Sequence, residues 1–393
     1  MSLLEDVFVA YYDARRNKRN TMNQLRFEFD LEKNLVELYE EIKERRYVVG
    51  RSVCFMVERP VLREVFAADF RDRVVHHLLF NYINPIFERT FIADSYACRK
   101  GKGTLYGIRR LEKHIRSCSC NYTRPCHVLK LDLQGYFMHI DRGRLHEMIM
   151  NVMQRYGRGK TEEGLYIRDT EEYQTAVYLI DCIVPYNPVE GCLRKGNRDG
   201  WRLLPHNKSL FYSPQGCGLP IGNLTSQLFS NIYLNELDRY MKRTLHVRHY
   251  GRYVDDFYVV HTDRRYLLSL LDPLKLMLSR QLGLTLHPHK IRLSDYRQGV
   301  VFTGAVLKPY RTYACRRTYG QFGVSMYRWE KCLVDADRHP SRGLLETVRA
   351  TLNSYLGLMR HFNSRKHAGK YIGRFAHIWE YGEMRTHAFR LSL

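Results

Sequence analysis

The sequence predicts an α+β protein, and three observations support that class. Apolar residues recur at helical spacing between Leu31 and Tyr47, as on an amphipathic helix. Short runs of β-branched and aromatic residues flank Asp255-Asp256, as in a β-hairpin with a polar turn. No internal repeat or low-complexity tract is found, and 393 residues suffice for two or three domains with well-buried cores.

The first hundred residues predict helices on either side of one hairpin. Residues 1–50 are predicted to be helical, and residues 51–66 contain alternating and β-branched runs around a proline, which favours a hairpin. Residues 69–92 return to a helical pattern, with His76–Leu79 on the buried face. A basic, glycine-punctuated loop follows at 99–104.

The middle of the chain predicts a strand, a turn and a long connection. Residues 127–133 predict a strand that ends at Asp132, and Gly135 permits a sharp turn behind it. Residues 157–215 hold many charges, glycines and prolines around one helical run at 171–184. We therefore expect 157–215 to be an insert-like connection.

The remaining elements are predicted from glycines, alternation and helical periodicity. Gly216, Gly218 and Gly222 predict a turn, followed by a largely buried helix from Leu224. The later elements are expected to be a hairpin at 250–261 with the aspartates at its turn, a helix at 264–282, a strand pair at 299–307 and a basic helical tail from 310.

The composition indicates a polyanionic partner. Lys and Arg number 63 against 41 Asp and Glu, giving a formal charge of +22, and aromatic residues make up 13% of the chain. Cations suit phosphates and aromatic rings suit stacking on bases, so nucleic acid is the expected partner. The alternative is a basic surface kept for solubility, which acidic residues achieve better.

The apolar runs and the cysteines indicate the cellular compartment and whether zinc is bound. No apolar run approaches the roughly 18 residues of a membrane span. No signal peptide precedes the ten scattered cysteines, so we expect reduced thiols in a cytoplasm. Cys118, Cys120, Cys126 and His127 suggest zinc, but without a Cys-x-x-Cys pair a Cys-rich loop or strand edge is the better interpretation.

The strongest chemical signal is the pair Asp255-Asp256 far downstream of Asp132. Adjacent like charges repel, and aspartate is disfavoured inside strands. A hard divalent cation held by oxygen ligands offsets that cost. Two such cations shared by Asp132 and Asp255 would support in-line phosphoryl transfer, which predicts a nucleic-acid polymerase. Asp256 is expected to point the other way, because strand side chains alternate; the alternative for the pair is a plain polar turn.

Six motifs in a fixed order carry a family resemblance. They are Arg63–His77, Leu129–Phe137, Gly218–Gln227, Tyr253–Asp256, Leu286–Lys290 and Phe302–Gly304. In that order they resemble the reverse transcriptases over residues 55–308, and more loosely in the C-terminal helices. The resemblance implies a right-hand polymerase with N-terminal helices and fingers at 1–125, a palm at 126–308 and a basic helical thumb at 309–393.

Within that family the chain is most similar to the enzymes of diversity-generating retroelements. Related bacterial enzymes carry Gln-Gly-x-x-x-Ser-Pro where this chain has the altered form Ile221–Gln227. The segments Phe66–Arg73 and Asn353–Gly357 also look like theirs. The likeness implies RNA-directed synthesis of cDNA from a template-repeat RNA, with errors at template adenines that diversify a variable gene.

The resemblance also implies roles for single residues. Asp132, Asp255 and Asp256 would hold two Mg²⁺ ions, for which Mn²⁺ would substitute, with the Leu133 carbonyl as an extra ligand. The residues implied to bind the dNTP are Arg63, Phe137 as the gate against a ribose 2′-hydroxyl, Ile221, Gly222 and Gln227 around the pocket, and Lys290 near the pyrophosphate; Arg59 would replace the second fingertip cation of the family. The alternatives are a core Phe137, a surface ion pair at Arg63, an ordinary helix start at Gln227 and a solvated Lys290.

The basic segments are expected to bind nucleic acid. Arg99, Lys100 and Lys102 would grip template phosphate. The thumb helices would follow the cDNA/RNA duplex through Arg349, Arg360, Arg365, Lys366, Lys370 and Arg374, unless this charge is simply a solvated face. Family membership implies a bacterial or phage-encoded enzyme with a basic helical-bundle accessory protein and no membrane contact.

Two other functions fit the same motifs less well. A retron-type or phage-defence reverse transcriptase is the first, and the Ile221–Gln227 segment argues against it. A catalytically silent RNA-binding scaffold is the second, and the presence of all three carboxylates argues against that.

Overall fold

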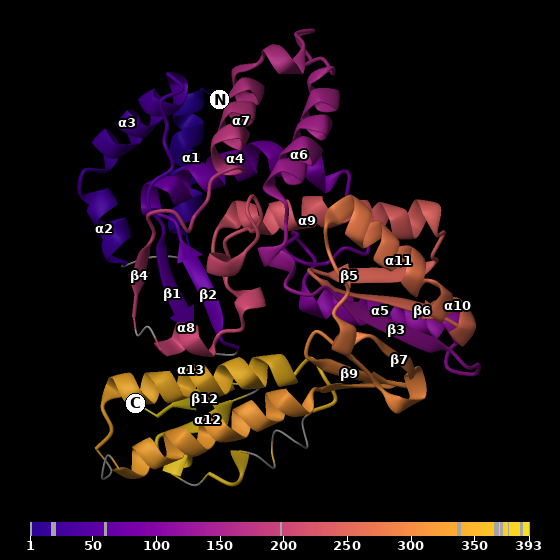
Figure 1. The fold of residues 1–393 in the computed structure, drawn as a ribbon. Helices are drawn as coiled ribbons and strands as arrows, with labels where there is room; N and C mark the ends of the chain where they lie inside the picture. The colour runs from indigo at the N-terminus through magenta and orange to yellow at the C-terminus, as the bar shows by residue number, and fades with distance from the viewer. Residues whose placement is uncertain are drawn as a thin grey trace. The chain divides into compact units, whose positions relative to one another are not determined.

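The computed structural model describes residues 2–16, 21–58, 61–196, 199–335, 339–364, 369, 372–375, 377–385 and 388–392 (Figure 1). Contacts divide the chain into two compact units. Unit 1 comprises Met1–Gly103, Lys130–Val259 and Arg265–Ile291; unit 2 comprises Thr104–Leu129, Val260–Arg264 and Arg292–Leu393. Helices and mainly antiparallel sheets occur in both, so the α+β prediction is confirmed at this level. The assignment of fingers, palm and thumb stays a prediction.

Unit 1 begins with the helices predicted for residues 1–50. They are α1 (Leu3–Arg15), α2 (Met22–Phe29) and α3 (Leu31–Lys43). A capping box starts α1, in which the Ser2 hydroxyl accepts from the Glu5 amide and the Glu5 carboxylate accepts from the Ser2 amide at 2.8 Å. The predicted helix at 69–92 is α4 (Phe70–Glu88), which packs against α1.

The predicted hairpin forms the first sheet. β1 (Val53–Val57) pairs antiparallel with β2 (Arg63–Ala67), with Cys54 opposite Phe66. A third strand, β4 (Leu193–Lys195), pairs parallel with β1 and gives the order β2-β1-β4. β4 comes from the predicted insert and was not expected, because its partner lies about 140 residues away.

The 157–215 segment is bound to this hairpin by a buried carboxylate. Glu64 of β2 is 1% exposed, and its carboxylate accepts from the Trp201 indole at 2.8 Å and the Leu210 amide at 2.7 Å. The Ser209 hydroxyl donates to it as well, at 3.1 Å. The segment is therefore an integral part of the sheet.

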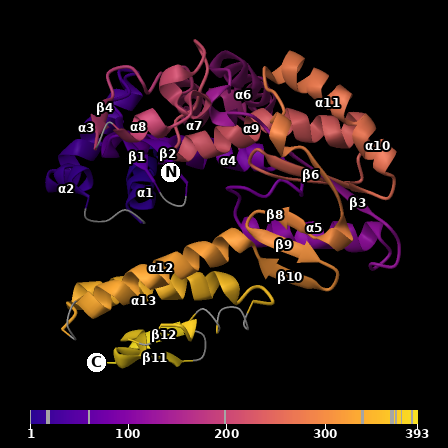
Figure 2. The same ribbon diagram turned by 60° about the horizontal axis from the view of Figure 1, so that its bottom comes forward.

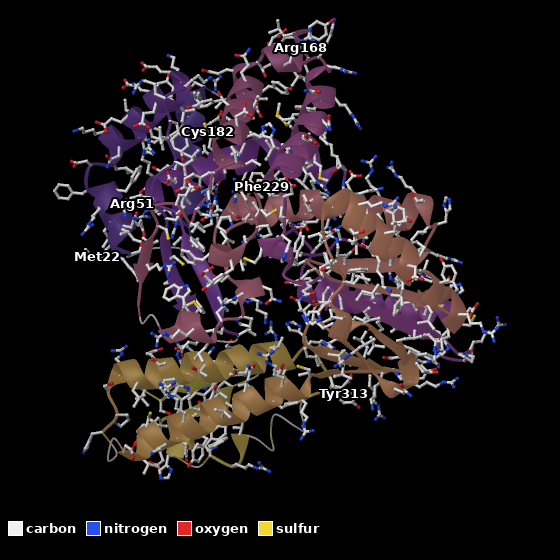
Figure 3. All side chains as sticks on the ribbon, viewed as in Figure 1. Met22, Arg51, Arg168, Cys182, Phe229 and Tyr313 are labelled. Carbon is white, nitrogen blue, oxygen red and sulfur yellow. The ribbon has the colours of Figure 1, made fainter. Side chains whose placement is uncertain are left out.

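Unit 1 contains β5 (His249–Tyr253), most of β6 (Asp256–His261) and the end of β3 (His127–Asp132), together with the helix α9 (Leu224–Arg239). The strands β5, β6 and β3 are neighbours in that order. The helix α9 is largely buried, as predicted. Phe229 of α9 lies in the interior of unit 1, whereas Met22 of α2 lies at its edge (Figure 3).

The other helices of unit 1 differ in part from the expectation. The helix predicted at 171–184 is α7 (Glu171–Ile183), and α6 (Arg142–Gly157) precedes it unpredicted. The single helix predicted at 264–282 is divided into α10 (Arg264–Ser269) and α11 (Leu271–Met277), followed by a π-helical turn. The shorter helical segments are Tyr136–Met138, Ile167–Asp169, α8 (Asp199–Leu203), His206–Lys208, Leu210–Tyr212, Tyr240–Thr244, Leu278–Leu282 and Pro288–Lys290.

Unit 2 has a small sheet against one helix. The helix is α5 (Thr104–Cys118), which contacts β9, and the sheet order is β10-β9-β8 (Figure 2). β8 (Val300–Phe302) and β9 (Ala305–Lys308) are the predicted strand pair, with Val301 opposite Val306. β10 (Arg311–Ala314) adds a strand where the sequence predicted helix. The elements β7 (Arg292–Asp295) and a short helix at Tyr296–Gln298 also belong to this unit.

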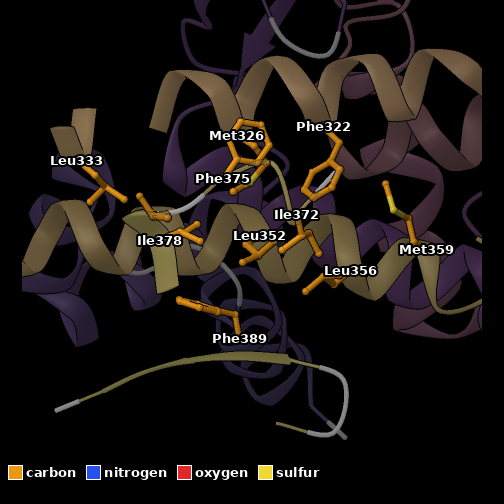
Figure 4. Packing of buried hydrophobic residues seen from close by; sticks show 11 residues of the cluster. Phe322, Met326, Leu333, Leu352, Leu356, Met359, Ile372, Phe375, Ile378 and Phe389 are labelled. Carbon is orange, nitrogen blue, oxygen red and sulfur yellow. The ribbon is translucent and has the colours of Figure 1, made fainter. Parts of the chain in front are cut away.

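The C-terminal part has its own apolar core. The helices α12 (Arg316–Asp335) and α13 (Arg342–Met359) run side by side (Figures 1 and 2). Their buried faces form a cluster that includes Phe322, Leu352 and Phe389 (Figure 4). A short helix at His377–Glu380 completes the helical part.

The prediction of an all-helical tail was wrong. β11 (Gly382–Arg385) and β12 (Ala388–Leu391) form a hairpin against α13. The Asn353 side chain donates to the Phe389 carbonyl at 2.9 Å and accepts from the Phe389 amide at 2.7 Å. The side-chain amide of Asn353 thus makes the two hydrogen bonds that a neighbouring strand would make, which explains how the edge of this two-stranded hairpin is stabilised.

Within the described ranges, no helix has the length and apolarity that a membrane crossing requires. All ten cysteines lie in those ranges and are free thiols.

Candidate functional site

Asp132 stands at the end of β3 and is 8% exposed. The chain beyond it pairs with a distant segment: the Gln134 amide donates to the Thr285 carbonyl at 2.9 Å, and the His287 amide donates to the Asp132 carbonyl at 2.8 Å. This pairing brings the turn Pro288–Lys290 to the strand end. Consequently the Lys290 ammonium lies 2.7 Å from Asp132 Oδ1.

The same pairing sets the direction of the Leu133 carbonyl. Leu133 and Leu286 form an antiparallel bridge in which only the residues on either side of Leu133 bond to the 285–287 segment. Backbone groups of successive strand residues point to opposite sides. The Leu133 carbonyl is therefore directed away from that segment, toward the side where β6 neighbours β3.

Gly135 makes the turn behind Asp132, as predicted. Its φ is +56°, and a Cβ there would stand 2.7 Å from the Asn207 carbonyl oxygen. A side chain at this position would have to displace backbone. The turn thus ties the strand end to the 157–215 segment.

The aspartate pair lies at a hairpin turn, as predicted. Asp255 is in the turn between β5 and β6, and Asp256 is the first residue of β6. Lys130 of β3 places its ammonium 3.1 Å from Asp256 Oδ1. Burial raises the pKa of Asp256, and the charge of Lys130 opposes that rise. The negative charge of Asp132 also raises the pKa of Asp256, even though Asp256 pairs with Lys130.

The pKa of Asp255 is more strongly perturbed than the pKa of Asp256. Burial raises its pKa to about 6, and the negative charge of Asp132 adds to the rise. A carboxylate near another in a partly desolvated place is driven toward its protonated form. Asp132 and Asp255 are therefore close enough for their charges to interact, and their shared role as metal ligands stays a prediction.

Lys130 was not predicted as a site residue. It lies two positions before Asp132 on the same strand, so both side chains emerge on one face. The alternation of Lys130, Leu131 and Asp132 was the signal that could have found it. Both ends of the carboxylate cluster thus have a lysine, Lys130 at Asp256 and Lys290 at Asp132.

Phe137 and Ile221 belong to one apolar cluster beside the hairpin β1–β2. Both pack against buried residues that include Phe66 and Met138. The Leu219 amide donates to the Phe137 carbonyl at 2.8 Å, and the Phe66 amide donates to the Ile221 carbonyl at 2.9 Å. The predicted gate is thus bonded to Leu219, just before the altered segment, and Ile221 is bonded to β2, so both lie against the same apolar cluster.

Gly222 lies against β2. Its φ is +136°, and a Cβ there would stand 2.5 Å from the Phe66 carbonyl oxygen. Glycine is therefore required here by the packing of the chain itself, and the predicted role of Gly222 in the nucleotide pocket stays a prediction. Of the other predicted nucleotide contacts, Arg63 is exposed at the start of β2 and Gln227 is exposed on the first turn of α9.

Arg99 corrects one expectation. Its side chain is 6% exposed, and its guanidinium donates to Glu88 at 2.6–3.0 Å and to the Ile92 and Ser95 carbonyls at 2.7 and 2.9 Å. With these donors engaged inside the fold, Arg99 holds the loop and does not present a free cation to phosphate.

The remaining basic residues differ in placement. Lys100 is exposed, and Lys102 donates to the Ala93 carbonyl at 2.7 Å. Arg360 is exposed at the end of α13, and Arg349 pairs with Glu346 at 2.6 Å. The predicted residues Arg59, Arg365, Lys366 and Lys370 lie outside the described residues, and Arg374 lies within them.

Comparison with known proteins decides the family. Residues 62–307 match the family described as reverse transcriptase (RNA-dependent DNA polymerase), and all three aspartates lie in that span. The chain belongs to the reverse transcriptase family. Membership supports RNA-directed DNA polymerase activity, as the sequence predicted.

Two curated proteins are similar to this reverse transcriptase. Protein YkfC of Escherichia coli K12 is 24% identical over 340 residues, which cover 77% of this chain and 76% of YkfC. Nuclear intron maturase 1, mitochondrial, of Arabidopsis thaliana is 24% identical over 208 residues. That match covers 48% of this chain and 27% of the maturase, so the chain spans about a quarter of the maturase's length.

Solved telomerase structures also align. Apo telomerase from Candida tropicalis gives a TM-score of 0.49 at 11% identity, covering 96% of this chain and 79% of that one. Telomerase from Candida albicans, solved with a fragment of telomeric RNA, gives 0.44 at 10% identity, covering 88% and 61%.

Reverse transcriptases generally use divalent metals such as Mg²⁺, and the donor set of this one fits such an ion. Oxygen ligands are what Mg²⁺ prefers, and two carboxylates with one carbonyl leave room for waters and phosphates. Within the described ranges, no three His, Cys, Asp or Glu side chains form a complete ion-holding group. One carboxylate oxygen of Asp132 pairs with the Lys290 ammonium, and one of Asp256 pairs with the Lys130 ammonium. The raised pKa of Asp255 is the feature that a dication would relieve.

Proposed function

We propose that this reverse transcriptase is an RNA-directed DNA polymerase whose catalytic carboxylates are Asp132, Asp255 and Asp256. The observation that carries the proposal is that the charge of Asp132 acts on Asp255. Both residues lie within the span that matches the reverse transcriptase family. Two bound Mg²⁺ ions would supply activation of the primer 3′-hydroxyl and neutralisation of the leaving pyrophosphate.

The chain's own residues would position the substrates. Asp132 and Asp255 would hold the ions, and the Leu133 carbonyl, directed toward β6, would be a further ligand. Lys290, whose ammonium lies 2.7 Å from Asp132, would stand near the leaving pyrophosphate and donate a proton to it. Phe137 and Ile221 would line the sugar and base side of the dNTP site.

The test is primer extension on an RNA template with dNTPs and Mg²⁺. We expect Asp255→Ala to abolish extension while RNA binding survives, because the ion loses a ligand and the nucleic-acid surface is untouched. Asp272→Asn is the matched control, since that carboxylate is 92% exposed on α11. Extension by Asp255→Ala at near the wild-type rate would refute the assignment.

We further propose that the enzyme is of the diversity-generating type, with a basic helical-bundle accessory protein as partner. The altered segment Ile221–Gln227 supports this, because Ile221 packs against the same apolar cluster as Phe137, where the templating base and the nucleotide would meet. Sequencing the cDNA made with and without the accessory protein tests it. We expect errors concentrated at template adenine, and fewer of them in Ile221→Gln.

The retron-type alternative predicts a different result. Such an enzyme would copy its template without a bias at adenine, and Ile221→Gln would leave the error spectrum unchanged. That outcome would leave the proposed polymerase activity standing and refute the proposal that the enzyme is of the diversity-generating type.

A further inference from the structure

A fully buried ion pair lies directly behind the aspartate turn. Arg252 of β5 and Asp238 of α9 are both 0% exposed. Arg252 Nε lies 2.8 Å from Asp238 Oδ1, and its Nη2 lies 2.6 Å from Oδ2. The Tyr250 hydroxyl also donates to Asp238, at 2.6 Å. Burying two charges is costly even when they pair, so this pair calls for a reason other than stability alone.

The guanidinium of Arg252 has no donor to spare. Besides Asp238 it donates to the Ser95 hydroxyl at 3.1 Å, the Asn231 side-chain carbonyl at 3.4 Å and the Val254 carbonyl at 3.0 Å. Together these contacts use all five N–H groups of an arginine. Only the bond to Val254 reaches the turn that carries Asp255.

Val254 is in a costly backbone conformation. Its φ is +56°, the left-handed region that β-branched residues rarely adopt. Such a residue persists only where its surroundings hold it. The Arg252 side chain supplies that hold on the carbonyl of Val254, which is the peptide group joined to Asp255.

The backbone of Arg252 is itself anchored. Its amide donates to the Asp94 carbonyl at 2.9 Å, and its carbonyl accepts from the Tyr96 amide at 2.9 Å. The guanidinium therefore spans from a fixed strand, through Asp238 on a buried helix, to the turn. Its planar fork sets several directions at once, which a lysine cannot do.

We propose that Arg252 is a positioning residue: paired with Asp238, it holds Val254 left-handed and so aims Asp255 at Asp132. This inference rests on the proposed function, because it assigns a purpose to the same carboxylates. Without the bond to its carbonyl, Val254 relaxes toward negative φ and Asp255 turns away from the place where an ion would bind.

The test compares Arg252→Lys with Arg239→Lys, a matched control at the end of α9 whose arginine is 39% exposed and pairs with Glu236 at 3.2 Å. Mn²⁺ affinity is measured by electron paramagnetic resonance, apart from primer extension and RNA binding. Residues that orient metal ligands typically affect metal affinity by about 10- to 100-fold, and we expect a loss of that size in Arg252→Lys alone, with RNA affinity unchanged.

Rescue separates positioning from a general role in folding. Glycine adopts positive φ without steric cost, so Val254→Gly no longer needs the guanidinium. We expect the double variant Arg252→Lys/Val254→Gly to regain most of the lost Mn²⁺ affinity and extension. Arg252→Lys/Val254→Ala should regain neither, because alanine keeps the steric cost.

The outcomes are distinct. An unchanged Mn²⁺ affinity in Arg252→Lys, or a loss that glycine does not relieve, overturns the proposal. If Arg252→Lys does not fold, a folded double variant that binds Mn²⁺ supports it, and an unfolded one overturns it. A wild type that binds Mn²⁺ but does not extend a primer refutes the polymerase activity and leaves the positioning comparison standing. A wild type that binds no Mn²⁺ overturns the positioning role together with the metal assignment.

Discussion

The carboxylate site and the C-terminal cluster bury side chains in opposite ways. The C-terminal cluster buries apolar side chains such as Phe322 and Leu352, with helix and hairpin around them. The carboxylate site buries Asp132 beside Asp255, raises the pKa of Asp255 and holds Val254 at positive φ. Apolar burial stabilises a fold, whereas like charges and a strained turn oppose it. The difference indicates that the C-terminal cluster serves stability, and it agrees with the catalytic role proposed for the carboxylate site.

The largest stability effect should come from the C-terminal cluster. Leu352 is fully buried, and Leu352→Ala should lower the free energy of unfolding by about 2–5 kcal/mol, because it removes apolar contacts and leaves a cavity. The matched control Val324→Ala, at a position 68% exposed on α12, should stay within about 0.5 kcal/mol. Denaturant unfolding measures both, and equal losses would contradict the role given to this cluster.

A backbone change near the predicted nucleotide pocket should come next. Gly222→Ala should cost more than about 1 kcal/mol, because its Cβ would meet the Phe66 carbonyl at 2.5 Å at a φ of +136°. Gly320→Ala is the control, in the second turn of α12 with open space around the added Cβ; it should stabilise by about 0.5–1 kcal/mol. Opposite signs in thermal unfolding are expected, and a tolerated Gly222→Ala would show that the segment can move off β2.

The pH dependence should single out Asp255. Its pKa is about 6 in the folded chain against about 3.9 when unfolded, so between these values the folded state binds the extra proton. Stability contributed by this group is therefore lost as the pH rises from about 4 to about 6. Asp255→Asn should remove that slope from the metal-free protein, as measured by unfolding at a series of pH values. Identical slopes in the two proteins would mean that Asp255 titrates normally.

The smallest effect concerns the lysine at Asp256. Removing the cation in Lys130→Met should raise the pKa of the Asp256 carboxyl further, because the charge of Lys130 opposes the rise that burial causes. Lys275→Met is the matched control, since Lys275 pairs with the exposed Asp272 at the same 3.1 Å. Carboxyl NMR titration of Asp256 measures both variants, and an equal response would show that Lys130 acts only through overall charge.

Local patterns predicted the elements that carry the aspartates better than they predicted the residues that support them. The strand ending at Asp132, the turn at Asp255 and the glycine behind Asp132 follow from alternation and turn chemistry over a few residues. Arg99 was misassigned because a basic loop looks the same in sequence whether its cations face solvent or, as here, Glu88 and carbonyls. Burial is a property of the whole fold, and a single sequence does not state it.

Long-range pairing explains the other misses. β4 has only three residues, and its partner β1 lies about 140 positions away, so no local signal marks it. β12 depends on the Asn353 side chain of α13 for its edge bonds. Arg252 lies in the predicted strand β5, but its partner Asp238 lies on the helix α9, so the ion pair was not predicted.

The carboxylate of Glu64 constrains how this protein can be shortened. The 157–215 stretch has the composition that engineers usually trim as a dispensable loop. Deleting it here would remove all three hydrogen-bond donors to Glu64. It would also expose the edge of β1, next to which Arg51 donates to the Gly191 carbonyl at 2.7 Å. A minimal version of the enzyme must therefore keep this stretch or refit the hairpin beneath it.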